Sequence, residues 1–144
     1  MAVDASDVEE MFVQQAAGMT RQGDTMSLVR VAASTLYFSN RPQRVVGHMT
    51  TEQFVGLWGE GTDSFQADPP QAVLSFADAL GEMEDAVVIL RSPSLDGVSL
   101  RYRIEVLEGT VPRSAGPCTL FIDAFGRPLS PVSIAGMRRR ERRL

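Results

Sequence analysis

The chain has 144 residues, a formal net charge of −4 and a hydrophobic content of 44%, a composition typical of one folded domain rather than a disordered chain. It contains no lysine, one cysteine and one histidine. These absences exclude a Walker P-loop, Schiff-base chemistry, a disulfide within the chain and any multi-histidine metal site.

The first ten residues are acidic and lack the basic and then apolar pattern of a signal peptide. No apolar run approaches the roughly 20 residues of a membrane helix, so we do not expect an integral membrane protein. The chain as written is predicted to be soluble and cytoplasmic, and it would be exported if a signal peptide preceded it.

Residues 6–18 are predicted to form a helix, with Gly18 as its stop. Ser6 and Glu9 have capping-box spacing, and Val8, Met11, Phe12 and Ala16 fall on one helical face. Residues 24–31 and 34–38 are rich in β-branched and aromatic residues and predict strands. Because the two alanines between them are poor turn formers, a single bent strand is as plausible as a hairpin.

A second short helix is predicted in residues 50–58, where Thr50 and Gln53 repeat the capping box. Its apolar face consists of Phe54, Leu57 and Trp58. Residues 63–70 then read as a loop, since Asp68 precedes Pro69 and is therefore held extended.

Strands dominate the remainder, at residues 72–77, 85–91, 98–107 and 118–124. In 98–107, apolar residues alternate with Ser99, Arg101, Arg103 and Glu105, which predicts one buried and one exposed face. The Asp96–Gly97 pair before it suits a hairpin turn. The predicted fold class is therefore mainly β (α+β): a single antiparallel β-sandwich or partly open barrel with two short helices.

The chain is predicted to be one globular domain over residues 1–144 with a basic C-terminal tail at 138–144. That tail, RRRERRL, carries +4, which leaves −8 on the rest of the chain. It could meet phosphates, anionic lipid or the protein's own acidic surface. Nucleic-acid binding is not expected, because the body is acidic and has no aromatic platform among basic residues.

Three strings, YFSNRPQRVVGHM, DPPQAVLSF and GPCTLFIDAFGRPLSPVS, resemble a group of uncharacterised bacterial proteins. That group carries similar YFSxRPxR…GHM, DPPxAxLS and GPCxLFID…GRPLSPxS motifs in the same order. The resemblance implies frequent export and no particular chemistry. Asn40 and Gln71 depart from it, since such proteins tend to have Asp and Asn at these positions.

The first of these strings holds the candidate site residues. Arg41 and Arg44 flank Pro42 and could form a fork for a carboxylate or phosphate, or simply a charged turn. His48 could act as a general base, since histidine ionises near neutral pH, or it could end a strand as a hydrogen-bonding residue.

Cys118 could pair with His48 as a nucleophile, but the apolar strand that follows favours a buried structural cysteine. The loop aspartates lack EF-hand spacing. We therefore expect no metal site and no cofactor.

Two functional hypotheses remain. The favoured one is a non-enzymatic binding or protein-interaction module, whose ligand is an unknown protein partner or a small anion bound by Arg41, Arg44 and His48. The alternative is a small hydrolase-like enzyme that uses His48 with Asp63, Asp68 or Asp123. A cleft that holds His48 beside a carboxylate would favour the enzyme.

Overall fold

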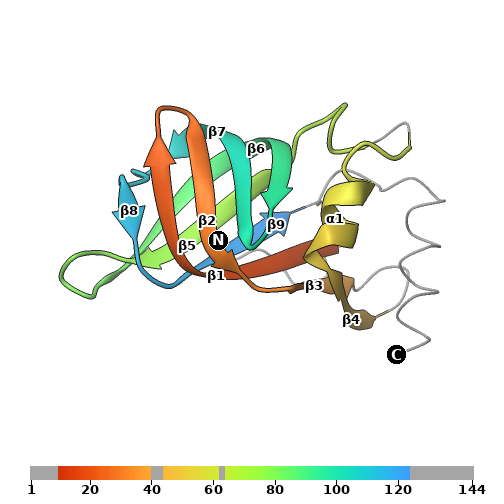
Figure 1. Cartoon of the computed structure of the whole chain (residues 1–144), viewed down its shortest axis with the longest axis horizontal. Coiled ribbons are helices and arrows are strands. Elements are labelled where there is room, and N and C mark those ends of the chain that lie inside the picture. Colours follow the sequence, from red (N-terminus) through yellow and green to blue (C-terminus); the bar gives the residue numbers. More distant parts are fainter. Residues whose placement is uncertain (1–9, 40–43, 62–63, 124–144) are drawn as a thin grey trace.

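The computed structural model describes residues 10–39, 44–61 and 64–123 (Figure 1). These residues form strands β1 (Glu10–Gln22), β2 (Thr25–Val31), β3 (Ser34–Ser39), β4 (Val45–Thr50), β5 (Gln71–Ala77), β6 (Met83–Asp96), β7 (Ser99–Glu108), β8 (Ser114–Ala115) and β9 (Cys118–Asp123), with helix α1 (Thr51–Leu57) between β4 and β5.

Six of the strands close into an antiparallel barrel. The order β2–β7–β6–β5–β9–β1 returns to β2, because β1 pairs with both β9 and β2. The mainly-β prediction is confirmed, whereas the sandwich is wrong and the barrel is closed rather than partly open. Each barrel strand is paired on both sides, which removes the exposed edges of an open sheet.

Strand β1 replaces the helix predicted for residues 6–18, a prediction whose first four residues lie outside the described part of the chain. The periodicity misleads because Phe12 and Ala16, four residues apart, share a face in a strand as well as in a helix. Long-range pairing with β2, β3, β8 and β9 decides the conformation. The described residues therefore contain one helix rather than two.

Strands β2 and β3 are two parts of one bent strand, and the hairpin alternative is wrong. Both run antiparallel to β1: β2 pairs with its second half and β3 with its first half. Ala32 lies at the bend, where its N–H donates to the carbonyl of Gln15. After the bend, β3 leaves the barrel, and β4 adds to its far side.

Helix α1 lies against one end of the barrel (Figure 1). The predicted capping box is confirmed: the Thr50 side chain accepts from the Gln53 N–H, and the Gln53 side chain accepts from the Thr50 N–H. Phe54 and Trp58 are buried and Leu57 is partly buried. The helix thereby adds two aromatic rings to the core.

The core aromatics form one continuous cluster. The ring centroid of Phe12 lies 5.2 Å from that of Tyr37 and 5.0 Å from that of Phe54, and Trp58 lies 5.8 Å from Tyr102. These separations lie within the range of favourable ring pairs. The cluster joins the helix to the interior of the barrel.

The described residues contain all of the predicted strands, at 24–31, 34–38, 72–77, 85–91, 98–107 and 118–124. Strand β6 extends to Asp96, and the last predicted residue of β9, at position 124, lies outside the described residues. In β7 the alternation is confirmed, with Leu100, Tyr102 and Ile104 buried and the intervening charged residues exposed. Val98 is 63% exposed, however, because the turn falls at Gly97–Val98 rather than Asp96–Gly97. Gly97 has φ 62°, which glycine adopts without steric cost.

No helix in the described part of the chain is long and apolar enough to cross a membrane. The predicted basic tail at 138–144 lies outside the described residues.

Candidate functional site

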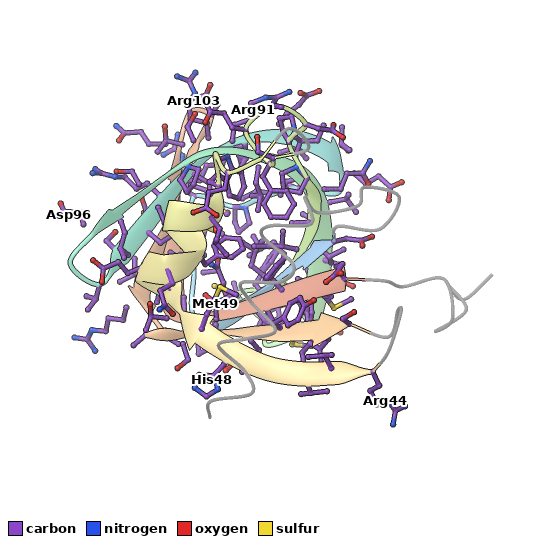
Figure 2. The ribbon with its side chains drawn as sticks, turned by 90° about the vertical axis from the view of Figure 1, so that its right-hand side faces the viewer. Arg44, His48, Met49, Arg91, Asp96 and Arg103 are labelled. Atoms are coloured by element: carbon purple, nitrogen blue, oxygen red, sulfur yellow. The ribbon has the colours of Figure 1, made fainter. Side chains whose placement is uncertain are left out.

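His48 lies on the outer face of β4, the last strand of the β9–β1–β3–β4 side of the sheet. It is exposed, and its neighbour Met49 is 4% exposed. Figure 2 shows Met49 pointing into the molecule and His48 pointing away from it. This arrangement follows from the alternation of side chains along a strand.

The second long edge of β4 has no partner strand among the described residues. The N–H of Thr51 donates to the carbonyl of Ala33 over 2.7 Å, which fixes the alternation of the β3–β4 ladder. Residues 45, 47 and 49 therefore direct their main-chain groups toward β3. Val46 and His48 direct theirs toward the open edge.

Apolar side chains cover the outer face beside this edge. Val46 is 65% exposed, Leu36 39% and Phe38 37%. They are adjacent, because Phe38 pairs with Val46 and Leu36 pairs with His48, and directly paired residues lie on the same face. We call Leu36, Phe38, Val46 and His48 the edge patch.

Arg44 immediately precedes β4 and is exposed, pointing away from the barrel (Figure 2). Its proposed fork partner Arg41 lies outside the described residues. Arg44 and His48 thus share one edge of the molecule and supply its basic and ionisable groups.

The structure does not bring His48 together with Asp123. Asp123 pairs with Met11, Met11 with Phe38 and Phe38 with Val46, so three strand spacings, about 14 Å, separate β9 from β4. Asp63 lies outside the described residues, and Asp68 follows α1 in a loop where its N–H donates to the Ser64 carbonyl. Within the described ranges, no carboxylate forms an ion pair with His48.

A buried chain of polar side chains fixes β3 to the barrel. The Tyr102 hydroxyl donates to Gln14 Oε1 over 2.7 Å, and Gln14 Nε2 donates to Thr35 Oγ1 over 3.2 Å. The Thr35 and Thr51 hydroxyls are 2.9 Å apart, and Thr51 donates to the Ala32 carbonyl. The barrel interior, β3 and the start of α1 are thereby connected.

Cys118 is buried, as predicted. Its thiol is 3.8 Å from the carbonyl oxygen of Gly18. Burial raises the pKa of the Cys118 thiol to about 11, away from the range in which a thiolate is available at neutral pH. Burial also raises the pKa of Tyr102 above its ordinary value.

A cavity of about 430 Å³ lies between α1 and the bulge of β6. Its wall includes Trp58, Phe65, Arg91, Ser92 and Pro93. Ser92 has φ 53°, a conformation uncommon outside glycine. Arg91 is paired with Glu105 at 3.2 Å. The described residues include no group of three histidine, cysteine or acidic side chains that could hold a metal.

Sequence reasoning identified Arg44 and His48 but missed the apolar part of the edge patch. The signal was present, because STLYFS has apolar residues at consecutive positions, so an apolar side chain must face outward. Which of them faces outward depends on the register with β1 and β4.

Comparison of the sequence with protein-family models gives no match, and neither curated proteins nor solved structures show significant similarity to it.

Proposed function

We propose that this protein is a non-enzymatic interaction module that binds an extended segment of a partner protein along β4. The observation that carries the proposal is the open edge of β4, where Val46 and His48 present their main-chain donors and acceptors beside exposed apolar side chains. Addition of a strand to such an edge is a recurring mode of peptide recognition.

Main-chain hydrogen bonds would supply the affinity of this mode, and the outer face would supply its specificity. A segment paired with β4 places alternate side chains beside Val46 and His48, over the apolar surface that Leu36 and Phe38 extend. Apolar residues at those positions of the partner would cover the edge patch, because burial of apolar area favours association.

The charged groups near β4 indicate which side chains the partner segment carries. Arg44 and His48 are the ionisable groups described on β4 and immediately before it, and both are exposed. An acidic side chain on the partner would complement Arg44, and like charge would be disfavoured. The partner segment we propose therefore alternates apolar and acidic residues.

Proline at position 46 tests the edge without disturbing the β3–β4 ladder. The Val46 N–H points away from β3, so Val46→Pro removes a donor only from the open edge. Gly47→Pro is the matched variant, because the Gly47 N–H bonds to β3 and its loss disrupts the ladder. We expect Val46→Pro to retain the wild-type melting temperature and to lose binding.

The probe is a synthetic seven-residue peptide that alternates glutamate and valine, compared with one that has lysine in place of glutamate. Hydrogen exchange of the Val46 and His48 amides, followed by NMR, reports pairing at the edge. We expect protection of both amides by the acidic peptide and at least about tenfold weaker binding of the basic one. In Val46→Pro, which has no amide N–H at position 46, we expect no protection of the His48 amide.

Equal binding of both peptides, or binding that survives in Val46→Pro, would overturn the proposal. So would a concentration-dependent dimer in analytical ultracentrifugation that Val46→Pro abolishes, because the edge would then be occupied by a second copy. The hydrolase hypothesis has no described carboxylate beside His48 to support it and stays a hypothesis.

A further inference from the structure

Arg21 and Arg113 lie directly opposite each other at the end of the barrel away from α1. Thr20 pairs with Ser114 and Met19 with Ala115, and the ladder continues with the Arg21 N–H donating to the Arg113 carbonyl over 2.8 Å. Arg21, near the end of β1, therefore lies opposite Arg113, which immediately precedes β8, and like charges directly opposite each other are destabilising.

Both arginines line an open cavity of about 740 Å³, the larger of the two cavities described. The rest of its wall consists of Thr20, Gln22, Gly23 and Val111. No aromatic ring is among these lining residues. The wall thus offers hydrogen-bond donors and positive charge rather than apolar area.

The Arg21 guanidinium is held in place by neutral acceptors. Its Nε donates to the Gly23 carbonyl over 2.8 Å, and its Nη1 donates to the Val111 carbonyl over 3.0 Å. These bonds fix the orientation of the side chain, and they leave its charge uncompensated. An arginine guanidinium has five N–H donors, so further donors remain for a ligand.

A second pair of facing arginines in this protein is neutralised by carboxylates. Arg91 and Arg103 are directly paired on β6 and β7. Each has its own carboxylate: Arg91 lies 3.2 Å from Glu105, and Arg103 lies 2.7 Å from Asp24.

The Arg21–Arg113 pair lacks such neutralisation. Among the described residues, no carboxylate lies within ion-pair distance of either guanidinium. Asp24, the acid next to Gly23 in the β1–β2 turn, already pairs with Arg103. The negative charge that carboxylates supply to Arg91 and Arg103 is therefore missing at the Arg21–Arg113 pair.

We propose that Arg21 and Arg113 bind a small, doubly charged oxyanion, the phosphate group of a phosphate monoester. Such a group accepts hydrogen bonds from two guanidinium forks at once and relieves the repulsion between them. The arginine site lies beside the second half of β1. The edge patch is on β3 and β4, and β3 pairs with the first half of β1, so the two sites are separate.

Isothermal titration calorimetry with inorganic phosphate and with glycerol 2-phosphate tests this site, in chloride buffers of matched ionic strength. Arg113→Gln is the decisive variant, because the Arg113 side chain makes no described hydrogen bond and its loss should leave the fold intact. Arg103→Gln is the matched control, since it removes one arginine of the neutralised pair. Arg113→Lys keeps the charge and removes the fork.

We expect wild type and Arg103→Gln to bind glycerol 2-phosphate alike, and Arg113→Gln to bind it at least about tenfold more weakly. Arg113→Lys should fall between them. Without ligand, Arg113→Gln should melt at or above the wild-type temperature, because one of two facing charges has been removed. Tighter binding of the monoester than of inorganic phosphate would support an ester ligand.

Three results would overturn the proposal: no phosphate binding above the chloride background, equal loss of binding in Arg113→Gln and Arg103→Gln, or tighter binding of inorganic phosphate than of the ester. A lower melting temperature of ligand-free Arg113→Gln would also contradict it, because Arg113 would then have a stabilising partner within the chain.

Discussion

Strands of both the closed barrel and the β3–β4 extension pair with β1. The barrel and the extension differ in whether every strand has a partner on both sides. In the barrel, β1 pairs with β9 on one side and β2 on the other. In the extension, β3 pairs with β1 and β4, and β4 ends the sheet within the described residues. The barrel satisfies its main-chain groups internally, and the extension leaves a row of them open.

The two regions also differ in where their apolar side chains lie. Barrel residues such as Leu90, Leu100 and Leu120 are fully buried. The extension keeps Leu36, Phe38 and Val46 between 37% and 65% exposed. The outer face of the extension therefore contributes little buried apolar area, whereas its inner residues Tyr37 and Met49 pack in the core.

Truncation of a buried barrel residue should have the largest effect. Ile104→Ala is expected to lower the free energy of unfolding by about 2–5 kcal/mol, because Ile104 is 6% exposed and a cavity would remain. Leu36→Ala should cost about 1 kcal/mol or less, since much of that side chain is already in water. Urea unfolding measures the free energy of unfolding of both variants. Equal losses would contradict the expected difference between the barrel and the outer face of the extension.

The polar contact between the two regions should have an intermediate effect. Thr35→Val preserves shape but removes the acceptor of Gln14 and the partner of Thr51, all three of which are buried. We expect a loss of about 1–3 kcal/mol in urea unfolding, the cost of unsatisfied buried polar groups. Exchange of the β3 and β4 amides should rise more than exchange of the barrel amides. A loss below about 0.5 kcal/mol would mean that the extension is not fixed by this contact.

Alkaline pH should weaken the barrel at β9. Cys118 lies in β9, and burial raises its thiol pKa from 9.0 to about 11. The folded state therefore favours the neutral thiol. Its contribution is complete below pH 9 and is lost as pH rises through about 11. Denaturant unfolding across this range should show a steeper decline in wild type than in Cys118→Ala. Parallel curves would place the thiol in contact with water.

Removal of an exposed charge from the barrel surface should have the smallest effect. Arg103 is paired with Asp24, but the two side chains are 63% and 58% exposed. Arg103→Ala should change the free energy of unfolding by no more than about 0.5 kcal/mol in either direction. A loss comparable to that of Ile104→Ala would show that β7 is buried on both faces.

Local signals in the sequence were sufficient for several elements. Thr50 and Gln53 define the start of α1 by side-chain chemistry that acts within four residues. The alternation in β7 identifies its buried face, because each side chain is buried or exposed according to its position along one strand. His48 and Arg44 stood out as rare or charged residues near a proline, but their place at the edge of the sheet came only from the strand pairing.

Residues 10–22 show where local signals were insufficient. The four-residue spacing of Phe12 and Ala16 fits the periodicity of a helix and that of a strand. The sequence of this segment carries no information about the strands that lie beside it. Gly18 read as a helix stop, yet it lies within β1, where a Cβ would approach the Ala115 carbonyl oxygen to 3.1 Å. The close passage of β8 explains that glycine, and it is visible only in the folded chain.

The sequence by itself determined a mainly-β domain, the position of one helix and the candidate residues Arg44 and His48, because these depend on composition, spacing and capping within short windows. Tertiary structure alone decided that six strands close, that β4 ends the sheet within the described residues, and that Arg21 lies opposite Arg113. The physical reason is that strand pairing joins residues about a hundred positions apart, such as Ala16 and Cys118, and main-chain hydrogen bonds leave no pattern in the side chains that would specify their partners.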